Sequence, residues 1–229
     1  MAVGGVPCFG LDTDAEPRGA RPWLPQALGP AEASRQSRGR HRDIRKNFPA
    51  TLAGIAREQD LAVDAVEIWF ADEARIGQKN SITRRWAQRG TRPSAPQDQR
   101  YASTYIFGAV CPRDGKGAAL VLPFCNTAAM NLHLAEISEM VSPGGTPCCC
   151  STRPGGTSRA ISQCRTTSPC PELNVMENVW QFMRDNWLSN RVFQDHDDIV
   201  DHCCHHWNRL VDQPWRIMSI GMRRWAHGF

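Results

Sequence analysis

A run of apolar, β-prone residues that stops at an acid constrains this chain more than any other stretch. Residues 66–77 read VEIWFADEARIG, and Ile68, Trp69 and Phe70 suit a central strand that is buried on both faces. The pattern predicts that this strand ends at Asp72, where a carboxylate on a rigid element reaches solvent or a metal ion. Glu73 is expected to point away from that site, because successive side chains alternate across a strand.

A second acid, Glu177, lies far downstream in the segment PELNVMENVW, residues 171–180. Asn174 is a good helix-capping residue, so a helix is expected from there to about Leu188. We interpret Asp72 and Glu177 as two members of a metal-binding acidic site, because hard divalent ions such as Mg²⁺ prefer carboxylate oxygens.

The composition is that of an ordinary globular protein. The chain has 229 residues, of which 41% are hydrophobic and 22% charged, and this predicts one domain, or one domain with an appended arm. The net charge of +4 is compatible with a nucleic-acid partner. A signal peptide and an apolar membrane span are both missing from the sequence, so we expect a cytoplasmic location and, despite ten cysteines, reduced thiols.

The order of elements along the chain predicts an α/β protein. Residues 1–43 have no lasting periodicity and are interpreted as a disordered or non-native N-terminal arm, with a basic DNA-binding arm as the alternative. The remaining expected elements are helices at 44–59, 127–141, 196–210 and 215–226, and strands at 82–88, 101–111 and 118–123.

Three segments carry a family resemblance: WFADEAR at 69–75, the stretch from Trp86 to Pro93, and the 171–180 segment around Glu177. Together they resemble IS630-type insertion-sequence transposases, which belong to the Tc1/mariner superfamily of DDE endonucleases. The resemblance implies an RNase H-like mixed sheet flanked by helices over residues 44–229, in a truncated member of the family. It also implies double-stranded DNA (transposon ends and target) as partner, and leaves a homodimer open.

The same resemblance implies a catalytic site of three carboxylates with two divalent metal ions, Mg²⁺ or Mn²⁺. Such ions activate the attacking oxygen and stabilise the leaving oxygen during cleavage of the transposon end and strand transfer. Asp72 matches the first acid and Glu177 the last. The second acid of the family ends another apolar strand, which follows the helix at 127–141.

That second acid is missing, because residues 141–171 contain no Asp or Glu. Residues 143–170 are rich in Pro, Gly, Ser and Thr, and we expect a disrupted segment in place of the middle strand. We hypothesise a frameshift here: a shifted reading of Pro147–Thr157 permits an apolar run of leucines followed by Asp, whose codon straddles Ser151 and Thr152. The chain is therefore expected to lack strand-transfer activity, and a non-enzymatic remnant that only binds nucleic acid is the alternative.

Basic residues crowd the region after the first strand. We interpret them as contacts to DNA phosphates, with a solvated basic hairpin as the alternative reading. These residues are Arg84, Arg85, Arg89, Arg92 and Arg100. The tryptophans of the C-terminal part, by contrast, are expected to pack in the core.

Overall fold

The fold is built on one mixed sheet of five strands in the order β3-β2-β1-β4-β5. The computed structural model describes residues 30–79, 87–91, 94, 98–151, 165–167 and 173–227. Strands β1 (Val66–Gly77), β2 (Ser103–Cys111) and β3 (Lys116–Leu122) form an antiparallel meander. Strands β4 (Thr146–Ser151) and β5 (Arg165–Thr167) extend the sheet in parallel on the other side of β1.

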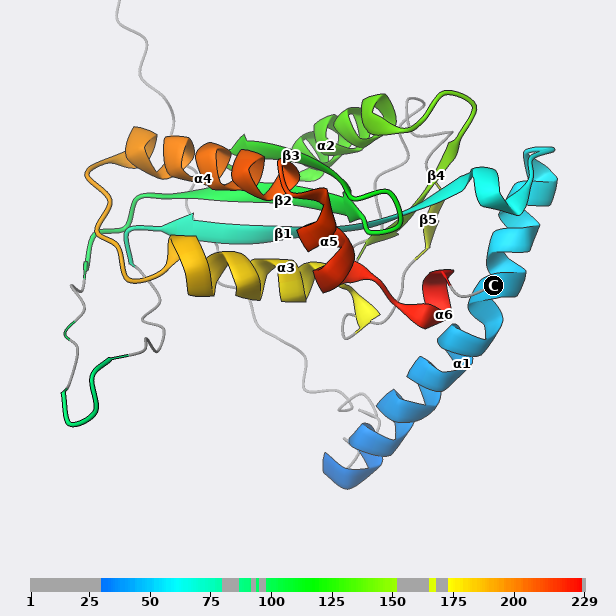
Figure 1. The fold of residues 1–229 in the computed structure, drawn as a ribbon, viewed down its shortest axis with the longest axis horizontal. Helices are drawn as coiled ribbons and strands as arrows, with labels where there is room; N and C mark the ends of the chain where they lie inside the picture. The colour runs from blue at the N-terminus through cyan, green and yellow to red at the C-terminus, as the bar shows by residue number, and fades with distance from the viewer. Residues whose placement is uncertain are drawn as a thin grey trace, which may run out of the picture.

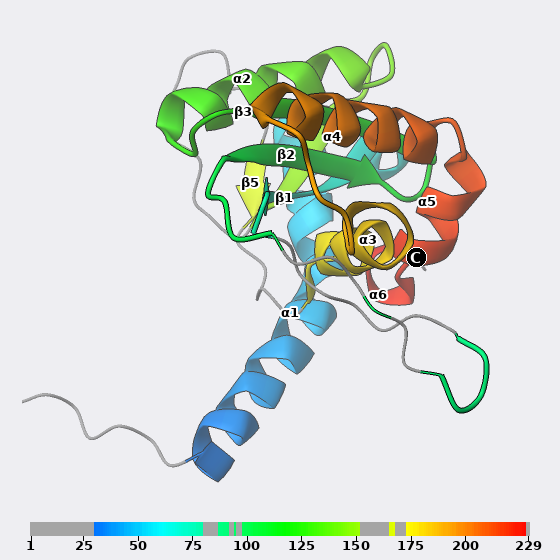
Figure 2. The same ribbon diagram turned by 90° about the vertical axis from the view of Figure 1, so that its left-hand side faces the viewer.

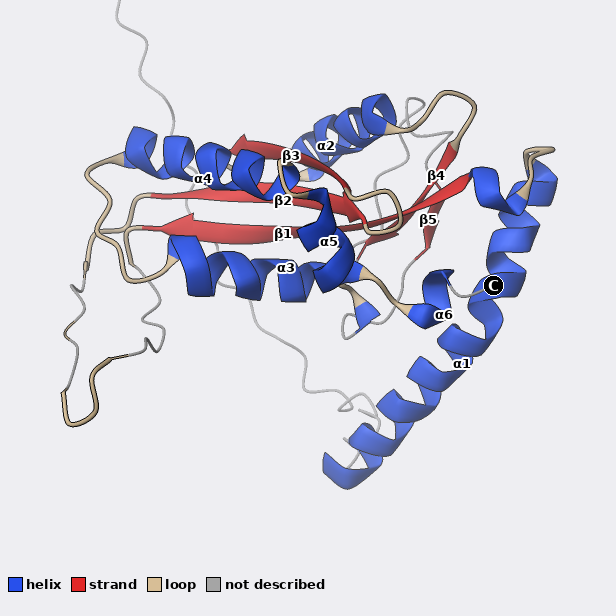
Figure 3. Ribbon diagram, in the orientation of Figure 1, coloured by secondary structure: helices blue, strands red, loops and turns tan. Residues whose placement is uncertain are grey.

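Helices cover both faces of this sheet (Figures 1 and 3). Helix α2 packs on one face, whereas α1 and the helices after β5 pack on the other. Figure 2 shows the N-terminal part of α1 extending away from the sheet. The helices are α1 (Pro30–Glu58), α2 (Thr127–Met140), α3 (Met176–Met183), α4 (His196–Val211), α5 (Pro214–Gly221) and α6 (Arg224–His227), with a 3-10 turn at Val63–Ala65 and a π-helical turn at Arg184–Leu188.

The alternation of side chains along β1 divides the core into two layers. Ile68 and Phe70 point toward the face covered by α1, α3 and α4, whereas Trp69 and Ala71 point toward α2. All four are at most 3% exposed, as expected of a central strand that is covered on both sides.

The α/β fold class, an RNase H-like mixed sheet flanked by helices, is confirmed, but the prediction of a disrupted middle strand is wrong. Residues 146–151 form β4, which pairs in parallel with β1 from Val66 and Thr146 to Ala71 and Ser151. Cys148, Cys149 and Cys150 are fully buried. Cysteine outside a disulfide behaves as a small hydrophobic residue, so Cys148 and Cys150 suit the interior positions of a strand.

Two further expectations differ from the structure. The helix expected from residue 44 begins at Pro30, so part of the predicted arm is helical, and residues 1–29 lie outside the described residues. The prediction of reduced thiols is wrong at Cys149, which is disulfide-bonded. The strand expected at 82–88 falls mostly on residues 80–86, which the structure does not describe.

The elements β2, β3, α2 and α4 are confirmed within a few residues at each end. The single helix predicted at 215–226 is divided into α5 and α6, because residues 222 and 223 are not helical. No helix in the described part of the chain is both long enough and apolar enough to cross a membrane.

Candidate functional site

Asp72 lies inside β1, and the prediction that the strand ends there is wrong. Antiparallel pairing with β2 continues from Asp72, opposite Gly108, to Gly77, opposite Ser103. The parallel pairing with β4, however, stops at Ala71. Asp72 is therefore the first residue of β1 beyond the end of β4, at an edge where a half-buried carboxylate retains access to solvent.

The segment before α3 is fastened to β1 beside this acid. The Asn174 side-chain amide donates to the Ala71 carbonyl oxygen at 3.0 Å, and its Oδ1 accepts from the Met176 amide at 3.1 Å. Asn174 is buried, so these hydrogen bonds are made away from water. One side chain therefore holds both the first residue of α3 and the residue before Asp72.

Trp180, further along α3, contacts Asp72 itself. Its indole Nε1 donates to Asp72 Oδ2 at 3.3 Å. The ring lies over Gly108, where an added Cβ would stand 2.6 Å from Trp180 Cη2. Trp207 of α4 backs the indole, with ring centroids 6.0 Å apart. A glycine on β2 and a second aromatic ring thus hold the donor in position.

Glu177 lies between these two contacts in sequence. It is in the first turn of α3, exposed, three residues after Asn174 and three before Trp180. Residues three apart on a helix are neighbours on its surface, so Glu177 lies next to Trp180, although Glu177 is exposed and Trp180 is buried. The contacts of Asn174 and Trp180 place α3, which carries Glu177, against the part of β1 that holds Asp72. That the two acids form one site stays a prediction.

The donor set does not fit a two-ion centre. Two carboxylates supply hard oxygen ligands, but the third acid expected near the end of β4 has no counterpart, because residues 141–171 contain no Asp or Glu. Asp72 and Glu177 are also missing from the one group of three possible ligands found among the described residues. The two acids alone therefore do not complete a two-ion centre.

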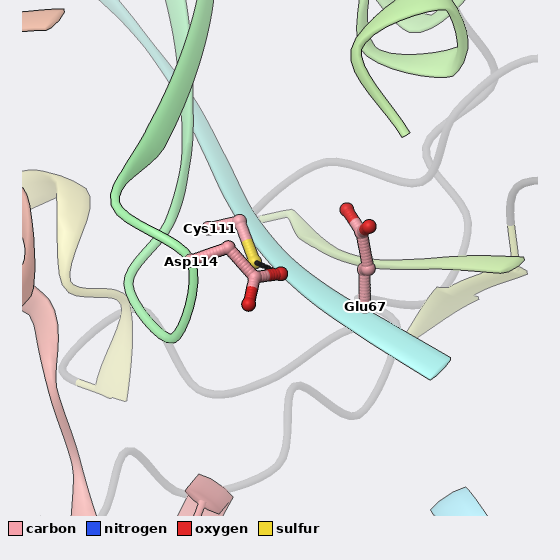
Figure 4. A group of neighbouring side chains, drawn as sticks. All are labelled: Glu67, Cys111 and Asp114. Atoms are coloured by element: carbon pink, nitrogen blue, oxygen red, sulfur yellow. Dashed lines mark hydrogen bonds between the residues drawn. The ribbon is translucent and has the colours of Figure 1, made fainter. Parts of the chain in front are cut away.

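That group consists of Glu67, Cys111 and Asp114, whose ligand atoms lie within 4.8 Å of one another (Figure 4). Glu67 lies on the opposite face of β1 from Asp72, the face that α2 covers. Lys116 Nζ donates to Glu67 Oε1 at 2.8 Å and to Ser142 Oγ at 2.7 Å. An ammonium group already neutralises the acid, which favours a structural ion pair over a metal site.

The pKa values of this group support the same interpretation. Burial alone raises the pKa of Glu67, but the hydrogen bonds from Lys116 and Ser142 outweigh it and hold the pKa below its ordinary value. Burial raises the pKa of the Cys111 thiol to about 12. A thiol that stays protonated at neutral pH is a poor metal ligand, because metals bind the thiolate.

Only two of the five arginines predicted to bind DNA lie in the described residues. Arg89 is exposed in a turn. Arg100 forms an ion pair with Asp98 at 2.7 Å, and its guanidinium also donates to the carbonyl oxygens of Phe193 and Gln194. Arg84, Arg85 and Arg92 lie outside the described residues. Arg100 therefore fastens the chain entering β2 to the α3–α4 connection.

Sequence reasoning missed Trp180 as a partner of Asp72, because it assigned the tryptophans to the core. Trp180 and Trp207 are indeed buried, whereas Trp215 is 60% exposed and that prediction is wrong there. The spacing of three residues between Glu177 and Trp180 on the predicted helix was the available signal.

Comparisons with known proteins concern the family and the fold of the chain. Residues 67–146 match the family model described as DDE superfamily endonuclease. The chain is 58% identical over 130 residues to the uncharacterized protein y4pE/y4sA of Sinorhizobium fredii (strain NBRC 101917 / NGR234), which covers 54% of this chain and 96% of that protein.

Solved structures support the fold. The Mos1 strand transfer complex is similar with a TM-score of 0.54 and 16% identity, covering 92% of this chain and 64% of that one. The Mos1 mariner paired-end complex with Mn is similar with a TM-score of 0.53 and 14% identity, covering 92% and 65%. The chain thus spans less than two thirds of the Mos1 chains, and at these identities the likeness concerns the fold.

Proposed function

The chain belongs to the family of the rhizobial protein y4pE/y4sA and carries a DDE superfamily endonuclease domain, and on this premise we propose that it is the catalytic domain of an IS630-type transposase in the Tc1/mariner superfamily. Such a domain acts on phosphodiester bonds of double-stranded DNA at transposon ends and targets, with Mg²⁺ or Mn²⁺. The observation that carries the proposal is the pair of contacts that fasten Ala71 to Asn174 and Asp72 to Trp180.

We include in this proposal that the domain no longer catalyses strand transfer. Asp72 and Glu177 remain, but the bridging acid of a two-ion site has no counterpart in residues 141–171. The test is a plasmid cleavage and strand-transfer assay with Mg²⁺ or Mn²⁺. The wild-type chain is expected to match Asp72→Ala, and activity above that variant would refute the loss of catalysis.

A restoration experiment tests the position of the lost acid. Ala71 and Ser151 form the last parallel pair, so the residue that follows Ser151 is the one to replace, although Thr152 lies outside the described residues. Thr152→Asp is expected to introduce cleavage that depends on Mn²⁺ and on Asp72. Ser151→Asp is the matched control, because Ser151 is the partner of Ala71 and is buried. Equal inactivity of both variants would argue against a single missing carboxylate.

The frameshift hypothesis has its own test at the nucleotide level. If neither shifted frame of the codons for Pro147–Thr157 encodes a leucine run followed by Asp, the hypothesis is wrong. The proposal of an incomplete acidic site does not depend on that outcome.

A non-enzymatic remnant that binds nucleic acid is the second candidate. It is favoured by the incomplete carboxylate set together with exposed basic side chains such as Arg89. Binding of labelled DNA that persists in Asp72→Ala and in the absence of divalent ions, with no cleavage by Thr152→Asp, would favour it. A cytoplasmic location and a homodimer are parts of the transposase proposal; sedimentation of the purified chain tests the second.

A further inference from the structure

A basic hollow lies at the far end of the β1–β2 ribbon, beyond Asp72. Its volume is about 290 Å³, close to the lower end of the range for small-molecule sites. In the described part of the chain it is lined by Arg75, Gly77, Lys79, Tyr101, Ala102 and Ser103.

The register of the two strands explains why the surface is hollow there. Gly77 pairs with Ser103 and Arg75 with Tyr105. Side chains at alternate positions share a face, so small residues at the centre are flanked by long ones on the same side. A Cβ at Gly77 would stand 2.9 Å from both the Ala102 carbonyl oxygen and Ser103 Cβ, so the floor requires glycine.

The opposite side of the ribbon is fastened to the protein body. The Gln78 amide donates to the Ala102 carbonyl at 3.0 Å, and the Gln78 Oε1 accepts from the Ala102 amide at 3.3 Å. Gln78 Nε2 donates to the carbonyl oxygen of Phe193 at 3.4 Å, and the side chain is 4% exposed. The hollow is therefore built on a fixed pair of strands.

The polar groups of the hollow favour an anion. Arg75 and Lys79 are both exposed, and no acidic side chain pairs with either among the described residues. Arg75 Nε donates to Ser103 Oγ at 3.0 Å, which orients the guanidinium and leaves its other N–H groups for a ligand. A guanidinium, an ammonium and hydroxyl groups around one small space suit the oxygens of a phosphate group.

The rim adds an aromatic surface to these charges. Tyr101 is 78% exposed, although it is a large ring, and Lys79 Nζ lies 5.8 Å from its centroid. An exposed ring beside cations is the combination that binds single strands, because every base has a face for stacking. Bases in a duplex are stacked on one another, so this ring favours an unpaired nucleotide.

We propose that this hollow binds an unpaired nucleotide of a nucleic-acid strand, with its phosphate held by Arg75 and Lys79 and its base stacked on Tyr101. The hollow is distinct from the acidic site, because side chains alternate along β1. Arg75 and Gly77 lie on one face of the strand, and Asp72 lies on the other. The proposal rests on the nucleic-acid binding proposed above, and it assigns that binding to residues other than the arginine cluster predicted from the sequence.

The test is fluorescence anisotropy of a short labelled single strand and of the duplex of the same sequence, at several salt concentrations. We expect wild type to prefer the single strand. Arg75→Ala and Lys79→Ala should each weaken binding and reduce the slope of log affinity against log salt by about 0.7. Tyr101→Leu should weaken single-strand binding roughly tenfold, and Tyr101→Phe should retain it. Lys46→Ala, on the exposed side of α1, is the control for a general loss of charge.

The outcomes separate this proposal from the proposed function. The nucleotide site in the hollow is refuted if single-strand binding is unchanged in Arg75→Ala, Lys79→Ala and Tyr101→Leu. DNA binding elsewhere on the chain is not affected by that result. If the wild-type chain binds neither the single-stranded nor the duplex nucleic acid, the proposed function fails. An NMR titration then tests whether the hollow binds a nucleotide. Shifts of the Gly77 and Ser103 amides with a nucleoside monophosphate, lost in Arg75→Ala, support a nucleotide site; shifts with inorganic phosphate alone, or none, overturn it.

Discussion

Substituting Gly108 by alanine is the sharpest test of the packing around Asp72. Gly108 is paired opposite Asp72, and an added Cβ would stand 2.6 Å from Trp180 Cη2 and 2.8 Å from Trp207 Cη2. Carbon atoms in contact prefer about 3.5–4.0 Å, so both rings would have to move by roughly 1 Å. Neither ring has room to do so, because Trp180 is 3% and Trp207 5% exposed.

The expected cost follows from this geometry. Forcing one methyl group into a filled core costs about 1–3 kcal/mol. Displacing the Trp180 indole also removes its hydrogen bond to Asp72, which contributes about 1 kcal/mol. We therefore expect Gly108→Ala to lower the free energy of unfolding by about 2–4 kcal/mol. For a domain of this size the melting temperature then falls by about 2–4 °C per kcal/mol.

Urea unfolding monitored by tryptophan fluorescence measures this change directly. Gly54→Ala is the matched control: Gly54 lies in α1, nothing stands within 4 Å of an added Cβ, and alanine in a helix interior is expected to stabilise by up to about 1 kcal/mol. The two alanines should thus act with opposite sign. A change of less than about 0.5 kcal/mol in Gly108→Ala would refute the packing of Trp180 and Trp207 against β2.

Three further predictions concern buried polar groups. Burial lowers the pKa of His133 from 6.5 to about 4. As the pH falls, this imidazole is therefore protonated in the unfolded chain before it is protonated in the folded chain. The His133 contribution to stability should therefore be complete above pH 6.5 and fall by about 3 kcal/mol as the pH drops to 4, and His133→Phe should flatten that slope in urea titrations. Asn174→Ala removes the side-chain partner of the Ala71 carbonyl and the Met176 amide and should lower the free energy of unfolding by about 1–3 kcal/mol. An unchanged urea midpoint would contradict the role of Asn174 in fastening α3 to β1. Lys116→Met leaves the buried Glu67 carboxylate without its ammonium partner and should lower the free energy of unfolding by about 3 kcal/mol. Adding Glu67→Gln to the same chain should restore most of that loss.

The elements with strong local patterns could be predicted from the sequence. The apolar run of β1 and the β-formers of β2 each carry their own signal over a few residues. Asp72 and Glu177 could be proposed as site residues because each stands in a distinctive segment. Their separation of more than one hundred residues is no obstacle to a prediction that rests on segment motifs.

The middle of the sheet shows where local patterns stop being informative. Cys148, Cys149 and Cys150 stand among Pro, Gly, Ser and Thr, a composition typical of a loop, yet they form the core of β4. What makes them a strand is the unsatisfied edge of β1, which supplies hydrogen-bond partners and two apolar faces to bury small side chains. That edge exists only in the folded sheet, so no short stretch of the sequence reveals it.

The sequence by itself determined the main strands and helices and the fold class, because propensity and periodicity act between near neighbours, and it named Asp72 and Glu177 as candidate site residues. The tertiary structure decided the rest: that Asp72 lies inside β1, that Trp180 donates to it across the fold, and that Arg75, Lys79 and Tyr101 surround a hollow. These depend on strand register and on side chains that meet only after the chain has closed on itself, which is why no local pattern contains them.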